Sequence, residues 1–304
     1  MTTDDTAPAL VARGRRLPTG RPLLMGVVNA STDSFSDQGE ARSLDTQLAH
    51  ALRLLDEGAD VLDVGGQSAI TNVPEIGVDV ELARVLPLVE AVVAARPDAV
   101  VSVDTYRPEV VRAALGAGAA IVNDVSNLAY PEVAGLCAEA GAALVVMHTR
   151  ARPKQRLQQA DLYDDVVADV VDRVSASIEV ARAHGLDERS IVVDPGVDFA
   201  KTPFQSIQLL RGIDRVAALG RPVLLALSRK DFVGALTLRP PAQRLAGSLG
   251  AVAAVGPRPG FLFRVHDVAA TADLLTVLRA LDGSLEVGPD LVLPDLIRHE
   301  ARPG

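Results

Sequence analysis

Short apolar runs alternate with longer segments of helical periodicity along almost the whole chain. The runs, rich in Val, Ile and Leu, cover residues 23–28, 61–64, 100–103, 120–122, 143–147, 191–193, 223–227 and 261–265. Continuous apolar runs of this length are typical of parallel strands that are buried on both faces. The segments with helical spacing between and after them cover residues 44–57, 80–94, 108–115, 131–140, 165–184, 204–219, 243–255 and 268–281.

Eight strand–helix pairs in one chain predict an α/β fold, either a closed barrel or an open doubly wound sheet. No G-x-G-x-x-G motif lies between the first strand and the first helix, which disfavours a dinucleotide-binding open sheet. The count of eight favours a single (β/α)8 TIM barrel over residues 21–282. Residues 1–20 and 283–304 are rich in proline, arginine and charge, and we expect an N-terminal arm and a C-terminal tail there, both flexible or peripheral.

Composition narrows the class of partner. The formal net charge of −9 argues against a nucleic-acid-binding surface, since neutralising phosphates requires a basic face. One basic cluster, made of Arg13, Arg15, Arg16 and Arg21, lies in the N-terminal segment, and we interpret it as solvated rather than phosphate-binding. No apolar run is long enough to span a membrane, and the acidic N-terminus lacks the apolar core of a secretory signal, so we expect a soluble cytoplasmic protein.

Polar residues follow every predicted strand. They lie in residues 29–37, 63–68, 104–106, 123–124, 148–149, 194–196, 228–230 and 264–267. The active sites of (β/α)8 barrels are built from residues at the C-terminal ends of the strands, whereas the opposite rim serves stability. The sequence therefore predicts one polar site on one face of the barrel.

These strand-end motifs, taken in order and with their spacing, resemble the dihydropteroate synthase family, a family of pterin-binding barrels. The resemblance extends from about Pro22 to Thr271 and is carried by residues 25–37, 102–109, 123–126, 228–230 and 264–268. It implies an enzyme that joins p-aminobenzoate to the methylene carbon of a hydroxymethyl-dihydropterin diphosphate and expels diphosphate. It also implies a homodimer. The predicted helices over residues 243–255 and 268–281 are apolar enough to pair, but apolar faces are also needed to cover the barrel.

The resemblance implies the pterin site. Asp104, Asn123 and Asp194 match the pterin-binding positions, Lys230 matches the donor to the acceptor atoms of the pterin, and Met147 is expected to contact the flat ring. A carboxylate suits the guanidine-like edge of a pterin because it accepts two parallel N–H groups. Each motif also has a local explanation, since Asp104 could cap the next helix and Asp194-Pro-Gly could form a turn.

The diphosphate is expected to bind Arg264, His266 and Asn29, with Asn29 helping to hold a Mg²⁺ ion that the diphosphate bridges. Asp37 matches an acidic position that could stabilise the cationic methylene left by the departing diphosphate.

Phe35, Ser228 and Phe199 match positions that line the p-aminobenzoate pocket. Three further residues stay open between alternatives. Asp63 either makes a strand-end hydrogen bond or contacts the ligand, His148 at a strand end either lines the site or does not, and Lys201 has either a supporting or a surface role.

The second loop departs from the family pattern. Where the family has G-G-E-S-T-R-P-G, this chain has Gly65-Gly66-Gln67-Ser68-Ala69-Ile70-Thr71-Asn72. Ile70 replaces an arginine that touches the ligands, and a lost charge-assisted hydrogen bond costs about 1.5–3 kcal/mol. Two alternatives to the synthase therefore stay open. One is a pterin-binding paralogue with weak or no synthase activity; the other is a related pterin-using methyltransferase, for which the expected diphosphate cations would have no use.

Two smaller departures lie near the expected ligands. Asp198 and Ala200 replace two glycines in the segment after the sixth strand, and Ala226-Leu227 precedes Ser228 where the family has a glycine.

Overall fold

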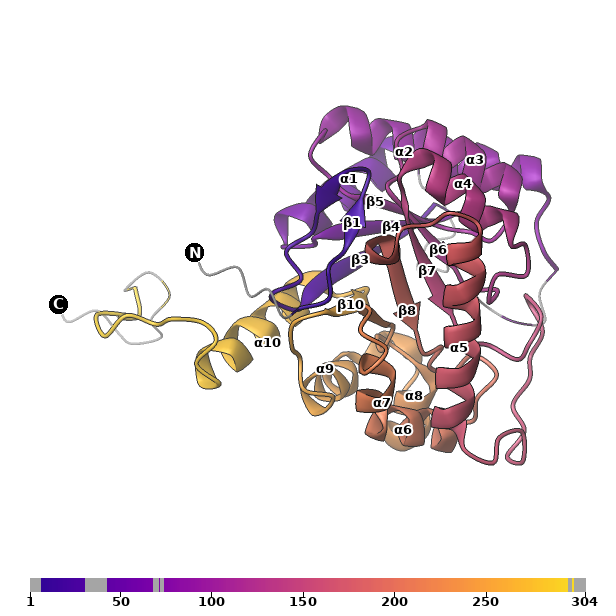
Figure 1. The fold of residues 1–304 in the computed structure, drawn as a ribbon. Coiled ribbons are helices and arrows are strands. Elements are labelled where there is room, and N and C mark those ends of the chain that lie inside the picture. Colours follow the sequence, from indigo (N-terminus) through magenta and orange to yellow (C-terminus); the bar gives the residue numbers. More distant parts are fainter. Residues whose placement is uncertain (1–6, 31–42, 68–70, 72–73, 295–296, 298–304) are drawn as a thin grey trace.

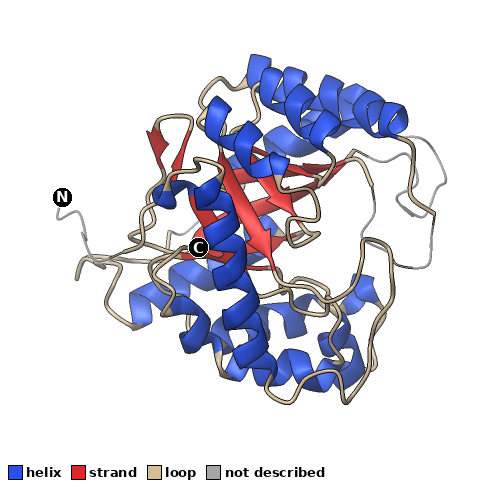
Figure 2. Cartoon of the chain, turned by 45° about the vertical axis from the view of Figure 1, so that its right-hand side comes forward, coloured by secondary structure: helices blue, strands red, loops and turns tan. Residues whose placement is uncertain are grey.

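A computed structural model describes residues 7–30, 43–67, 71, 74–294 and 297 of the chain. Within this part, eight parallel strands close into a barrel in the order β10-β3-β4-β5-β6-β7-β8-β9, with helices around the outside (Figures 1 and 2). The barrel strands are β3 (Leu23–Asn29), β4 (Val61–Gly65), β5 (Val101–Asp104), β6 (Ile121–Asp124), β7 (Ala143–Met147), β8 (Ile191–Asp194), β9 (Val223–Leu225) and β10 (Phe261–Val265). The predicted single (β/α)8 barrel is confirmed.

The helices follow the strands in regular alternation. They are α1 (Leu44–Asp56), α2 (Val78–Ala95), α3 (Pro108–Gly116), α4 (Glu132–Ala140), α5 (Val166–Ala183), α6 (Pro203–Arg211), α7 (Ile213–Ala217), α8 (Asp231–Thr237), α9 (Leu245–Ala254) and α10 (Val268–Leu281), with 3-10 turns η1 (Glu188–Ser190) and η2 (Pro241–Gln243). Local sequence explains several boundaries. Thr202 and Gln205 form a capping box before α6, and the Asp165 carboxylate caps α5. None of these helices in the described ranges is both long and apolar enough to cross a membrane.

The predicted helix over residues 204–219 is wrong in one respect, because the structure divides it into α6 and α7 at Gly212. A side chain at residue 212 would come within 2.8 Å of the Val167 side chain, so the close approach of α5 requires glycine at this point. Helix α8 was not predicted at all. Its seven residues are too few to display a helical period.

Apolar side chains fill two layers. One layer lies between the barrel and the helices. The other lies inside the half of the barrel nearest the N-terminal ends of the strands and includes Met25, Val61 and Leu224. This inner layer also contains Leu10 and Leu17 from the N-terminal segment. This half of the barrel is therefore filled by apolar side chains, and the polar residues gather at the C-terminal ends of the strands.

Residues 7–20 are not the flexible segment that their composition suggested. They form a short hairpin of β1 (Val11–Ala12) and β2 (Arg15–Arg16) that closes the N-terminal end of the barrel. Arg13 is exposed, as predicted, and its guanidinium also donates to the carbonyl oxygens of Leu115 and Ala119 at 2.8 and 3.2 Å. Beyond α10, residues 283–294 project away from the barrel, in agreement with a peripheral tail (Figure 1).

Candidate active site

A buried network of charged residues forms the floor of the polar face. The guanidinium of Arg264 on β10 reaches across the barrel, donating from Nε to Asp63 Oδ2 at 2.6 Å and from Nη2 to Asp104 Oδ2 at 2.8 Å. Asn123 on β6 donates from Nδ2 to the same Asp63 oxygen at 3.1 Å. Asp104 and Asn123 are partners in the register of β5 and β6. Four strands thus contribute to one hydrogen-bonded group, and Asp63 is at its centre.

Burial shapes the charge of this floor. Burial raises the pKa of the Asp104 carboxyl to about 7, although the nearby Arg264 guanidinium acts to lower it. For Arg264, burial lowers the pKa, but the carboxylates of Asp63 and Asp104 outweigh burial and raise it above its ordinary value. Arg264 therefore stays charged beside an Asp104 carboxyl whose pKa lies near neutral pH.

The floor contains polar atoms that the protein leaves unpaired. Asp63 Oδ1, Asn123 Oδ1 and the hydroxyl of Ser102 are buried and, among the described residues, have no hydrogen-bond partner. Most buried polar atoms in native proteins are hydrogen-bonded, and an exception needs an explanation. Side chains on β4, β5 and β6 thus offer acceptors and a donor that suit a polar ligand or bound water.

The next sector of the site lies at the ends of β8 and β9. Asp194 is buried and accepts a hydrogen bond from the Gly196 amide at 2.7 Å. Lys230 lies above it, donating from Nζ to the Val197 carbonyl at 3.0 Å, with its ammonium 4.6 Å from the centre of the Phe199 ring. Met147, the register partner of Asp194, is fully buried beside it. Four predicted residues therefore meet in one sector.

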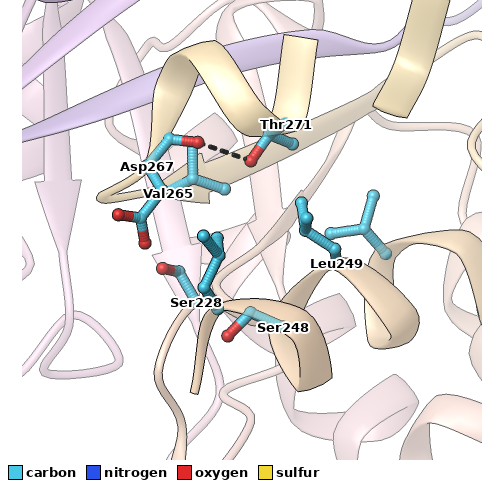
Figure 3. Close-up of a pocket in the computed structure, with 8 residues that line it drawn as sticks. Ser228, Ser248, Leu249, Val265, Asp267 and Thr271 are labelled. Atoms are coloured by element: carbon cyan, nitrogen blue, oxygen red, sulfur yellow. Dashed lines mark hydrogen bonds between the residues drawn. The ribbon is translucent and has the colours of Figure 1, made fainter. Parts of the chain in front are cut away.

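The last sector joins the ends of β9 and β10. Ser228 Oγ and His266 Nδ1 are 3.0 Å apart, and Arg229 donates from Nη2 to Asp267 Oδ1 at 2.8 Å. The side chains of Ser228 and Asp267 approach one another, and Thr271 donates to the Asp267 carbonyl at 2.8 Å (Figure 3). Burial, together with the nearby guanidiniums of Arg229 and Arg264, lowers the pKa of His266 to about 4, so its imidazole is neutral at pH 7.

Asp267, three residues after Arg264 in the sequence, pairs with Arg229 instead. The side chain of Arg264 points into the barrel while Arg229 approaches from the adjacent loop.

Asn29 is exposed at the end of β3, on the same rim. In the described ranges, no group of three or more His, Cys, Asp or Glu side chains could hold a metal ion. Any divalent cation here would need ligands from elsewhere, such as a substrate diphosphate. An exposed amide oxygen fits that arrangement.

Phe35, Asp37, Ala69 and Ile70 lie outside the described residues. The base of the second loop is described, and side chains hold it. Gln67 Oε1 accepts from the Ile76 amide at 2.8 Å, and Arg107 donates to Glu75 and Glu81 at 3.0 and 2.9 Å. The glutamine that departs from the family pattern therefore closes the loop across its own base.

Sequence reasoning left the roles of Lys201 and His148 open and did not identify the cluster that they form with Asp169 beside the site. Lys201 is fully buried, which excludes a surface role, and its Nζ lies 2.8 Å from His148 Nδ1. His148 in turn contacts Asp169 through Nε2 at 2.7 Å, so it lies behind the site rather than lining it. Asp169 lies in the first turn of α5, and no sequence motif singled it out.

Residues 25–266 match the model of the family described as pterin binding enzyme. The chain belongs to this pterin binding enzyme family. It is 41% identical over 276 residues to the inactive dihydropteroate synthase 2 of Mycobacterium leprae, covering 89% of this chain and 94% of that protein. It is 36% identical over 271 residues to the dihydropteroate synthase of Escherichia coli K12, covering 89% and 95%.

Solved structures agree with this family assignment. The dihydropteroate synthase of Xanthomonas albilineans, solved with 4-aminobenzoic acid, is 42% identical and superimposes with a TM-score of 0.83, covering 91% of this chain and 99% of that chain. The match therefore extends through the whole barrel of this pterin-binding enzyme, including all the strand ends described above.

Proposed function

We propose that this protein is a dihydropteroate synthase, a transferase of folate biosynthesis. It would condense p-aminobenzoate with (7,8-dihydropterin-6-yl)methyl diphosphate to give 7,8-dihydropteroate and diphosphate. The observation that carries the proposal is the joined floor, in which Arg264 links Asp63 to Asp104 and Asn123 shares the same carboxylate. Its unpaired acceptors match the N–H edge of a pterin.

In the proposed reaction, the bond between the methylene carbon and the diphosphate oxygen breaks, and the electron pair leaves with diphosphate. The aniline nitrogen forms the new bond to that carbon and releases one proton. Asp194 and Asn123 would hold the pterin, while Lys230 would donate to its acceptor atoms. Arg264 and the neutral His266 would face the leaving diphosphate, where fixed donors matter most because negative charge develops there.

Magnesium fits this proposal as a substrate-bound ion. Mg²⁺ in protein sites often takes one or two protein oxygens together with substrate phosphates. Asn29 offers one exposed amide oxygen on the rim. When bound, the ion would neutralise part of the charge on the leaving diphosphate.

A coupled assay with the pterin diphosphate and p-aminobenzoate, with Mg²⁺ or with EDTA, tests the proposal. We expect dihydropteroate to form with Mg²⁺ and turnover to fall at least tenfold in EDTA. Absence of product at micromolar enzyme, under conditions where the Escherichia coli enzyme turns over, would refute synthase activity.

A second candidate is a pterin-binding paralogue without synthase activity. Two observations favour it, namely the 41% identity to a protein named as inactive and the replacement of the second-loop Thr-Arg pair by Ala69-Ile70. Calorimetry distinguishes the candidates. Binding of the pterin diphosphate without any product would support the paralogue, and product formation would exclude it.

We also propose a cytoplasmic homodimer. Apolar side chains of α9 and α10 are exposed, with Leu245 38%, Val277 56% and Leu281 80% accessible. Exposed apolar surface of this kind marks association sites in soluble proteins. Sedimentation velocity tests it: the double variant Val277→Glu with Leu281→Glu should sediment as a monomer, whereas Val80→Glu on α2 should leave the dimer intact.

A further inference from the structure

The loop between β8 and α6, residues 195–202, is held by side chains along its whole length. Lys230 donates to the Val197 carbonyl at 3.0 Å, and the Tyr163 hydroxyl donates to the Ala200 carbonyl at 3.0 Å. The carbonyls of Gly196 and Phe199 accept from Lys201 Nζ at 2.8 and 3.0 Å. Four consecutive or near-consecutive carbonyl groups are thus fixed by three side chains, which turns a loop into a rigid element.

The backbone of this loop is strained. Asp198 and Ala200 have φ values of +67° and +51°, in the left-handed region that non-glycine residues rarely adopt. Gly196 has a φ of +68°, and a side chain there would lie 1.9 Å from the His148 carbonyl oxygen. A strained backbone persists only where the surrounding contacts hold it in place. The hydrogen bonds of Lys201 therefore offset the free-energy cost of this strain.

Lys201 is placed to supply that constraint. Its side chain is fully buried, and its three ammonium protons have three acceptors, namely the two loop carbonyls and His148 Nδ1. His148 Nε2 then donates to Asp169 on α5, at 2.7 Å. The order Asp169, His148, Lys201 and loop gives each hydrogen bond one donor and one acceptor when His148 is neutral. Burial lowers the pKa of His148 to about 3, which keeps it so.

We infer that Lys201, fixed by His148 and Asp169, is a positioning residue that holds the 195–202 loop so that Phe199 faces the second substrate. The inference rests on the proposed synthase function. Lys201 touches no substrate itself, because its side chain is fully buried. Phe199 is partly exposed, and the ammonium of Lys230 lies 4.6 Å from the centre of its ring.

This role predicts a selective kinetic effect. Lys201→Met removes two hydrogen bonds to loop carbonyls and one to His148, but it leaves Asp104, Asn123 and Arg264 on other strands untouched. The KM for p-aminobenzoate should rise about tenfold or more, as loss of a charge-assisted hydrogen bond allows, whereas the KM for the pterin diphosphate should rise less than about threefold.

His148→Leu provides a second variant that keeps Lys201 in place. If His148 acts through Lys201, the double variant should have the same KM for p-aminobenzoate as Lys201→Met alone. Independent roles would multiply the two single effects, and that result would overturn the inference. Arg21→Met is the matched control, since it removes a cation paired with Asp60 on the opposite rim and should leave both KM values unchanged.

Hydrogen exchange tests the same inference without turnover. Amides of residues 196–201 should exchange at least tenfold faster in Lys201→Met and in His148→Leu than in the wild-type protein, while the strands keep their protection. If the wild-type protein makes no product, the proposed function fails, yet faster exchange still supports the positioning role. Unchanged exchange in both folded variants, together with unchanged KM in an active enzyme, would overturn it.

Discussion

Replacing Asp63 by asparagine would test whether this residue organises the floor of the site. Asp63 is fully buried and accepts hydrogen bonds from Arg264 at 2.6 Å and Asn123 at 3.1 Å. Asparagine keeps the size and one acceptor but removes the charge. A hydrogen bond to a charged group is worth about 1.5–3 kcal/mol, and removing one partner of a buried ion pair costs about 3–5 kcal/mol. Because Arg264 keeps its hydrogen bond to Asp104, we expect the free energy of unfolding to fall by about 2–3 kcal/mol, near the lower end of these values.

The expected loss appears in two measurements. Urea unfolding followed by far-ultraviolet circular dichroism should give a free energy of unfolding lower by that amount, and kcat/KM should fall about ten- to a hundredfold as Arg264 shifts. Asp60→Asn is the matched control, since Asp60 also accepts two hydrogen bonds from one arginine, but at the opposite rim. It should cost only about 1 kcal/mol or less, because its partner is partly exposed, and turnover should be unchanged. Equal loss of turnover in both variants would refute a specific role for Asp63.

Three further predictions concern the remaining parts of the site. Lys230→Ala and Arg264→Ala should each remove most synthase turnover in the coupled assay, and near-normal rates in either would contradict the site assignment. Ala69→Thr with Ile70→Arg should raise turnover about tenfold by restoring a charged contact, and an unchanged rate would mean that the second loop works differently here. The pKa of His266 falls from 6.5 to about 4 on folding, so between these pH values the unfolded chain binds more protons, and stability should fall as the pH falls. His266→Gln should make urea midpoints at pH 7 and pH 4.5 more alike, and an unchanged difference would contradict this.

Hydrophobic periodicity, together with the count of eight strand–helix pairs, predicted the architecture of this protein. Parallel strands buried on both faces produce apolar runs, and the runs at residues 143–147 and 261–265 match β7 and β10 without error. The sequence also predicted where the polar residues gather, because they follow the strands and all parallel strands of a barrel end on one rim. The sequence therefore predicts that Asp104, Asn123, Asp194 and Lys230 lie on one face.

The hydrophobic pattern gave wrong predictions where tertiary packing, rather than local composition, determines the structure. Arginine and proline made the N-terminal segment look flexible or peripheral, yet Leu10 and Leu17 within it lie in the barrel core. A short hairpin has too few residues to display a period. The single predicted helix over residues 204–219 failed for a related reason, because only the proximity of Val167 explains the break at Gly212.

Sequence determined which polar residues share the rim of this barrel, but only tertiary structure decided their partners. Arg264 could pair with Asp267 three residues away, yet it spans the barrel to Asp63 and Asp104 while Arg229 takes Asp267. Lys201 could have been a surface residue, yet it lies buried against His148. These pairings join strands and loops separated by 38 to 201 residues, and their geometry depends on closure of the whole barrel. A linear pattern contains the residues of such a site, but the distances between them exist only after folding.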